Sequence, residues 1–157
     1  MFKDKTIVYT SGTFDMFHYN HLRMINYARS LADILIVGVS TDELVMSFKP
    51  KPIIPFTERM QIIEALKTPD IVIPQHTLDH TDIVKKLNID AFVVGDDWFG
   101  KYDYLKDIGV QVFYFPYGAG VSSSNLKKTI YESYEAQLKK EQKQKPVQIK
   151  KNEADQI

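Results

Sequence analysis

Two histidines stand three residues apart in the stretch SGTFDMFHYNH (residues 11–21), together with Thr13 and Asp15. The stretch follows an apolar run at 5–10 and leads into a segment with helical spacing of apolar residues. A helix N-terminus leaves backbone N–H groups unpaired and attracts anions. Imidazoles there can donate hydrogen bonds to phosphate oxygens and take up a proton as negative charge approaches. We therefore expect His18 and His21 to contact a phosphate-bearing ligand.

A metal site is the other interpretation of this pair, and the sequence supports it less. No third ligand is apparent near the two imidazoles, and the chain contains no cysteine. We expect no metal held by protein side chains. His76 and His80 lie in a polar stretch and are expected to be ordinary surface residues.

Composition limits the class of protein. A chain of 157 residues suits one domain with a sizeable core. The 20 basic residues balance the 20 acidic ones, so no overall positive field indicates nucleic acid as a partner. No apolar run approaches the roughly 18 residues of a membrane span, and the N-terminus lacks the apolar core of a signal peptide. The expected location is the cytoplasm, where cysteine-free chains are unremarkable.

Strand and helix patterns alternate along most of the chain. Strands are expected at 5–10, 34–40, 70–74, 91–95 and 110–115. Helices are expected at 21–32, after a capping box of Ser40 and Glu43, after a cap at Thr57, at 81–88 and from about residue 122. Five buried strands alternating with helices predict an α/β fold, an open parallel five-stranded sheet with helices on both faces.

The last 20 residues differ in composition from the rest. Residues 138–157 hold six lysines against three acidic residues, repeated glutamines and one proline. Such a segment cannot bury much apolar surface. We predict a single catalytic domain at 1–137 and a frayed or disordered tail at 138–157.

Three segments with reactive side chains follow the carboxyl ends of predicted strands. They are residues 11–21, 95–103 and 116–124. Ligands of open α/β sheets bind beyond these ends. The three segments are therefore expected to meet at one site.

The same segments carry a family resemblance. GTFDMFHYNH resembles the first signature of the nucleotidyltransferase superfamily, a T/S-x-F-D segment leading to H-x-G-H, and GVSSSNLKK resembles its second. VVGDDWFGKYDYLKD is similar to a segment of glycerol-3-phosphate cytidylyltransferases. STDELVMSFKPKPIIPFTER is similar to a stretch of choline- and ethanolamine-phosphate cytidylyltransferases. These matches keep their order over roughly residues 5–130, which makes a chance origin improbable.

The resemblance implies a Rossmann-like nucleotidyltransferase fold and an enzyme. The implied reaction transfers a cytidylyl group from CTP to a small phosphorylated alcohol like glycerol 3-phosphate. Pyrophosphate leaves and a CDP-linked product forms. Magnesium is expected to accompany the nucleotide, carried largely by phosphate oxygens and water. A homodimer is expected, since relatives of this size commonly form one.

The resemblance also assigns residues. The implied catalytic residues are His18, His21 and Lys49. The implied nucleotide-binding residues are Thr13, Phe14, His18, His21, Gly95, Asp97, Ser122 and Ser123. The implied acceptor-binding residues are Lys49, Lys51 and Lys67. Two interpretations of Arg59 remain, a surface ion pair with Glu58 or a phosphate contact. Trp98 could belong to the core or form an aromatic wall beside the ligand.

Three positions depart from the family pattern. Asn20 replaces the glycine of H-x-G-H, and asparagine is the residue that best tolerates positive φ in its place. Tyr117 stands where the glycerol-3-phosphate enzymes have an arginine, and Lys67 replaces another. These departures leave two alternatives open: an adenylyltransferase of the same fold acting on a phosphorylated cofactor precursor, or a nucleotide-binding module without turnover.

Overall fold

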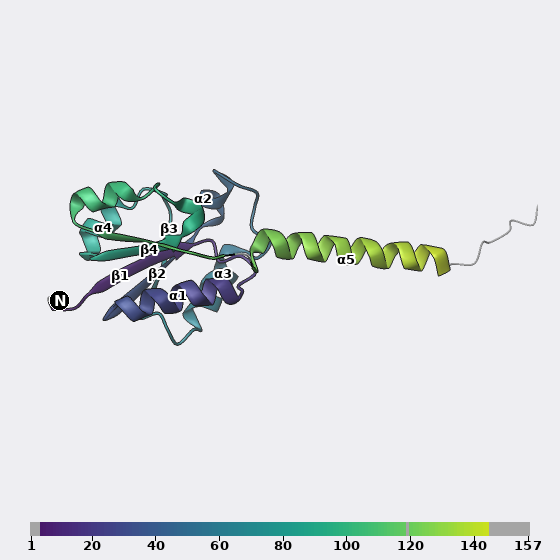
Figure 1. Cartoon of the computed structure of the whole chain (residues 1–157), viewed down its shortest axis with the longest axis horizontal. Coiled ribbons are helices and arrows are strands. Elements are labelled where there is room, and N and C mark those ends of the chain that lie inside the picture. The colour runs from purple at the N-terminus through teal and green to yellow at the C-terminus, as the bar shows by residue number, and fades with distance from the viewer. Residues whose placement is uncertain (1–3, 119, 145–157) are drawn as a thin grey trace, which may run out of the picture. The chain divides into compact units, whose positions relative to one another are not determined.

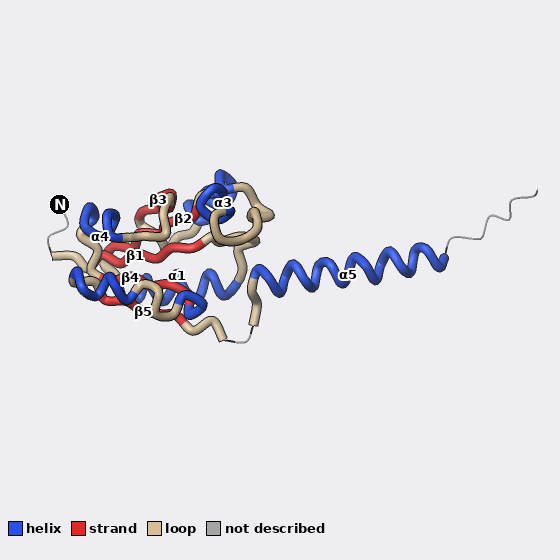
Figure 2. Tube along the Cα trace, turned by 90° about the horizontal axis from the view of Figure 1, so that it is seen from above, coloured by secondary structure: helices blue, strands red, loops and turns tan. Residues whose placement is uncertain are grey.

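The computed structural model describes residues 4–118 and 120–144. Its five strands are β1 Ile7–Gly12, β2 Ile34–Ser40, β3 Ile71–Gln75, β4 Ala91–Gly95 and β5 Gln111–Phe115. They form one parallel sheet in the order β3-β2-β1-β4-β5 (Figures 1 and 2). The predicted fold class is confirmed.

Helices cover both faces of this sheet (Figure 1). They are α1 Tyr19–Leu31, α2 Asp42–Met46, α3 Phe56–Glu64 and α4 Thr81–Leu87, with two 3₁₀ turns at Asp96–Trp98 and Asp103–Ile108. One core joins α1 and α3 to the sheet through Met24, Ile25 and Ile63. The other lies on the opposite face and includes Val84 and Leu105. Apolar residues on both sides of each central strand explain the continuous apolar runs in the sequence.

The strand order creates a switch point between β1 and β4. The chain proceeds from β1 outward to β2 and β3, then returns to place β4 on the other side of β1. The connections that leave β1 and β4 therefore diverge, and ligands of such sheets bind at this place. The segment with the two histidines follows β1, and the segment with Asp97 follows β4.

Two helices begin differently from the prediction. The N-cap of α2 is Thr41, whose Oγ1 accepts the N–H of Leu44, because Ser40 still belongs to β2 and donates to Gln75 Oε1. The N-cap of α3 is Pro55 rather than Thr57, so this helix starts at Phe56 without a side-chain cap. Proline there has the fixed φ that suits a helix start.

The chain divides into two compact units, one ending at Ser123 and the other beginning at Ser124. Helix α5, Ser123–Gln144, makes up almost all of the described second unit. Residues 138–144, the start of the predicted tail, continue this helix, where Glu135 pairs with Lys139 at 3.5 Å. Residues 145–157 lie outside the described residues. None of the helices in 4–118 and 120–144 has the length and apolar character needed to cross a membrane.

His80 is a core residue, which corrects the expectation of a surface histidine. Its side chain is 1% exposed, its ring stacks on Tyr102 with centroids 5.0 Å apart, and its Nε2 lies 3.3 Å from Ser11 Oγ. Burial lowers the pKa of His80 to about 4. The polar sequence around residue 80 gave no sign of this, because the contacts come from β1 and from the 3₁₀ turn region.

The buried imidazole should make stability depend on pH. The unfolded chain binds the proton near pH 6.5 but the folded chain only near pH 4, so the free energy of unfolding must fall between these values as the pH drops. We expect His80 to account for a loss of about 2 kcal/mol between about pH 7.5 and pH 5. Urea denaturation at both pH values should show a smaller loss for His80→Gln than for the parent. His76→Gln, at an exposed position, is the control. Equal losses in all three proteins would contradict the assignment.

Candidate active site

The two histidines form a stacked pair at the start of α1. His18 is the N-cap, and its Nδ1 accepts the N–H of Asn20 at 3.2 Å. His21 Nδ1 in turn accepts the N–H of His18 at 3.3 Å, and the ring centroids are 3.7 Å apart. Because both Nδ1 atoms are acceptors, each neutral ring carries its proton on Nε2. Both Nε2–H groups are thus left as donors for a ligand.

Both imidazoles are held in the neutral form. Burial lowers the pKa of His18. Burial, followed by the charges of His18 and Lys49, lowers the pKa of His21 to about 3. At neutral pH the pair therefore donates hydrogen bonds without carrying charge. The approach of phosphate oxygens favours the protonated form, so the pair can gain charge when negative charge arrives.

The turn before the pair is strained. Phe14 and Met16 have φ of 54° and 48°, in the left-handed region that non-glycine residues rarely occupy. Such residues cost on the order of 1–3 kcal/mol each and persist where the surroundings enforce them. Here the Phe14 ring is buried and meets His21 edge-on, with centroids 5.4 Å apart. The Phe14 ring therefore packs against the His21 ring. Thr13 precedes Phe14 in the same turn.

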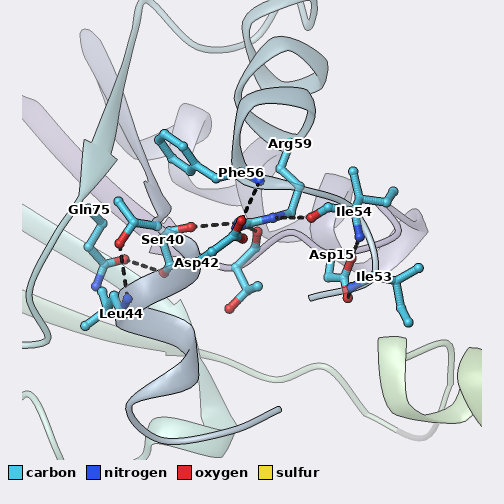
Figure 3. Close-up of polar contacts among 11 residues, drawn as sticks. Asp15, Ser40, Asp42, Leu44, Ile53, Ile54, Phe56, Arg59 and Gln75 are labelled. Carbon is cyan, nitrogen blue, oxygen red and sulfur yellow. Dashed lines mark hydrogen bonds and ion pairs between the residues drawn. The ribbon is translucent and has the colours of Figure 1, made fainter. Parts of the chain in front are cut away.

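Asp15 fixes the Pro-rich loop, residues 47–55, to this turn. Its carboxylate accepts the N–H groups of Ile53 and Ile54, both at 2.9 Å (Figure 3). Its backbone carbonyl accepts a hydrogen bond from Ser123 Oγ at 2.7 Å. Asp15 thus braces two loops against the histidine turn.

Arg59 is fully buried, which rules out a surface pair with Glu58, one of the two interpretations left open by the sequence. Its guanidinium donates to the carbonyls of Thr13 at 2.6 Å, Ser40 at 2.7 Å and Ile54 at 2.9 Å. It also pairs with Asp42 at 2.7 Å (Figure 3). Five guanidinium N–H groups in a planar fork suit such a set of acceptors.

Asp42 is the partly exposed partner of the buried guanidinium, with 26% of its side chain accessible. Burial opposes its ionisation, but hydrogen bonds from Arg59 and from the N–H of Phe56 outweigh burial and lower the pKa of the carboxyl. The sequence gave no sign of the pair, because 17 residues separate its members.

The two lysines of the Pro-rich loop act on different groups, and the Lys49 ammonium lies 5.4 Å from the centroid of the Phe48 ring. Burial lowers the pKa of His21 and raises that of Asp97, and the positive charge of Lys49 has a smaller lowering effect on each, so its ammonium lies within electrostatic range of both. The backbone N–H of Lys49 donates to the Val45 carbonyl at 2.9 Å. The charge of Lys51 acts on Asp42 instead. The structure thus brings Lys49 to the predicted site and leaves Lys51 at its edge.

Gly95, Asp97 and Tyr117 form one wall of the site. A Cβ on Gly95 would lie 2.1 Å from the Tyr117 ring and 2.5 Å from an Asp97 carboxylate oxygen, so only glycine fits there. Asp97 is exposed as a whole, but its carboxyl lies against this wall, and desolvation raises its pKa. Tyr117 points into the protein, with its hydroxyl 3.2 Å from Met24 Sδ. This side chain therefore does not replace the arginine of the family pattern as a ligand contact.

Asn20 does not have the positive φ that glycine would explain. It lies in the first turn of α1 with helical geometry, and its Nδ2 donates to the Val121 carbonyl at 2.6 Å. Ser122 and Ser123 follow in the same loop, and Ser123 begins α5. The structure therefore brings the second signature beside the first, as predicted from the strand ends.

Two further predicted residues have different outcomes. Trp98 is half-buried and lies between Phe48 of the Pro-rich loop and Tyr102, with centroids 5.6 Å and 5.7 Å away. It thus packs on the core of this face and also contacts the Pro-rich loop. Lys67 lies in the connection that enters β3 at its amino end, whereas the other site residues lie at the carboxyl ends. The structure of this chain does not bring Lys67 to the site.

The buried pair of Arg59 should be far more important for stability than an exposed one. Arg59→Leu leaves Asp42 and three carbonyls without their donor, so we expect the free energy of unfolding to fall by about 3–5 kcal/mol. Lys106→Ala is the control, because its pair with Asp103 is about half exposed. We expect that change to cost under about 1 kcal/mol. Chemical denaturation of both variants measures the difference, and similar losses would contradict the importance of burial.

Comparisons with known proteins agree with this geometry. The Cytidylyltransferase-like family model matches residues 9–129. The chain is 40% identical over 122 residues to the glycerol-3-phosphate cytidylyltransferase of Bacillus spizizenii, covering 77% of this chain and 94% of that protein. It is 39% identical over 125 residues to the enzyme of the same name from Bacillus subtilis, covering 78% and 95%.

A solved structure supports the fold alone. The lipopolysaccharide core biosynthesis protein from Thermoplasma volcanium aligns with a TM-score of 0.60 and 24% identity, over 71% of this chain and 95% of that one.

The matched region of the family model includes the histidine pair, the Pro-rich loop, the Gly95 wall and both serines. The chain therefore belongs to the cytidylyltransferase-like family.

Proposed function

We propose that this protein transfers a cytidylyl group from CTP to a small phosphorylated alcohol such as glycerol 3-phosphate, with release of pyrophosphate. The observation that carries the proposal is the pair of neutral imidazoles at the start of α1. In each ring Nδ1 accepts a backbone N–H, so the proton is on Nε2, which can donate to a ligand. The similarity to glycerol-3-phosphate cytidylyltransferases over most of both chains supports the choice of substrates.

The reaction needs no covalent enzyme intermediate. A phosphate oxygen of the acceptor attacks the α-phosphorus of CTP, and a new P–O bond forms. The bond from the α-phosphorus to the bridging oxygen breaks, and its electron pair leaves with pyrophosphate. The protein contributes positioning and stabilisation of the added negative charge. His18 and His21 donate to the phosphate oxygens, and the positive end of the α1 helix dipole adds to that field.

Lys49 is the proposed contact of the acceptor phosphate. Its positive charge acts on both His21 and Asp97, which supports a position of the ammonium near the site.

Magnesium would accompany the nucleotide and offset the charge of the triphosphate. Within residues 4–118 and 120–144, no three His, Cys, Asp or Glu side chains are grouped so that they could hold a metal ion. Magnesium bound to a nucleotide is typically carried by phosphate oxygens and water. We further infer a homodimer working in the cytoplasm, as the family resemblance implies; sedimentation of the purified protein tests the dimer.

Loss of either imidazole should reduce turnover sharply. We expect His18→Ala and His21→Ala each to lower kcat by about a hundred- to a thousandfold, the usual effect of removing one preorganised donor. His76→Ala, an exposed histidine outside the site, is the control. Pyrophosphate release with CTP and glycerol 3-phosphate measures the effect. Near-normal rates in both variants would contradict the proposed site. Turnover with ATP and not CTP would favour an adenylyltransferase.

The two lysines of the Pro-rich loop should separate by their kinetic effects. Lys49→Ala removes a charge near His21 and Asp97, so we expect a larger rise in the KM for the phosphorylated acceptor than in the KM for CTP. Lys51→Ala, in the same loop but beside Asp42, should have a clearly smaller effect. Initial rates over a grid of both substrates give the four constants. Equal rises in both KM values for Lys49→Ala would remove this residue from the acceptor pocket.

A further inference from the structure

We propose that Asn20 is a positioning residue that holds the serine loop, residues 116–118 and 120–123, against the start of α1 before the nucleotide binds. The proposal extends the proposed function, because it assigns to Asn20 a role in CTP binding. No ligand contact by the Asn20 side chain is involved.

The side chain of Asn20 is almost completely buried, and each part of it has a partner. It is 5% exposed. Its Nδ2 donates to the Val121 carbonyl at 2.6 Å, across 101 positions of sequence. Its Oδ1 accepts from Arg23 Nη1 at 3.1 Å. The carboxamide thus has a fixed orientation, with the acceptor side toward Arg23 and the donor side toward the serine loop.

Arg23 is itself held in place by two rings. Its guanidinium lies 5.3 Å from the centroid of Phe115, at the end of β5, and 6.0 Å from that of Tyr19. Cation–π contacts of this length favour one orientation of the guanidinium. The chain of contacts therefore runs from β5 through Arg23 and Asn20 to the loop that follows β5.

The contact to Val121 lies between two other ties of the serine loop. Near its start, Tyr117 donates to Met24 Sδ, and at its end Ser123 donates to the Asp15 carbonyl. In the middle, a Cβ on Gly120 would lie 3.4 Å from Asn20 Nδ2, so the loop backbone passes directly over the carboxamide. Without Asn20 the middle of the loop would lose its hydrogen bond to α1.

The position of Asn20 explains why this tie matters for the nucleotide. The backbone N–H of Asn20 fixes the His18 ring, and its side chain fixes the loop that carries Ser122 and Ser123. One residue therefore sets the distance between the histidine pair and the serine hydroxyls. A glycine, which the family pattern has at this place, keeps the backbone contact and lacks the side-chain one. A loop that is already ordered loses less conformational entropy on binding.

Substitutions at position 20 test the side chain alone, because the backbone N–H remains in each of them. We expect Asn20→Ala to raise the KM for CTP about two- to tenfold, the effect of one lost hydrogen bond, and to change kcat by less than about twofold. Asn26→Ala is the matched control: Asn26 is exposed on the same helix and accepts a hydrogen bond from Thr68 at 3.3 Å. It should leave both constants unchanged.

Hydrogen exchange without nucleotide tests the tie independently of activity. Amides of residues 117–123 should exchange several times faster in Asn20→Ala than in the parent and in Asn26→Ala. Asn20→Asp should match Asn20→Ala, because a carboxylate can still accept from Arg23 but cannot donate to Val121. If Asn20→Ala fails to fold, the same exchange and kinetic measurements are made on Asn20→Ser.

Two failures can be told apart by these measurements. Unchanged exchange of 117–123 in the folded variants overturns the positioning role, whatever the kinetics. A parent protein that does not turn over CTP, yet shows the change in exchange on substitution, overturns the proposed function and leaves the tie intact. A fall in kcat equal to the rise in KM would overturn the assignment to nucleotide binding.

Discussion

The buried guanidinium of Arg59 is the interaction on which the rest of the site depends. It joins the carbonyl of Thr13 after β1, that of Ser40 at the end of β2 and that of Ile54 in the Pro-rich loop. These three segments are far apart in sequence, and each contributes a backbone carbonyl to the guanidinium. A single planar cation with five donors satisfies them together, and Asp42 balances its charge. The strained backbone of the histidine turn persists because Arg59 fixes both the Thr13 carbonyl within the turn and the Pro-rich loop beside it.

The stacked imidazoles illustrate preorganisation for a negatively charged ligand. A charged pair at 3.7 Å would repel itself in the free protein, so burial and mutual proximity keep both rings neutral. Their tautomers are set by backbone donors rather than by other side chains. The donors are therefore oriented before any ligand arrives, and little reorganisation is needed when charge develops.

Sequence reasoning predicted the strands, the parallel sheet and the meeting of three strand ends, because period and apolar runs are local signals. It also identified the histidine pair and Lys49 from residue type, spacing and family resemblance. It missed the burial of Arg59 and His80, since both depend on partners 17 to 69 residues away in sequence. The family resemblance assigned Lys67 to acceptor binding, whereas the structure has this residue in the connection that enters β3 at its amino end. Sequence reasoning explained Asn20 by its tolerance of positive φ, whereas the structure shows a side-chain contact to Val121.

The two anchors of the Pro-rich loop have a consequence for how Lys49 can move. Asp15 holds the loop at Ile53 and Ile54, and the Val45 carbonyl holds the backbone of Lys49 itself. Only the three residues 50–52 lie between these anchors, and two of them are prolines. Such a segment has little freedom to swing as a flap. The backbone of Lys49 is therefore fixed, and its ammonium changes position only by rotation about the side-chain bonds.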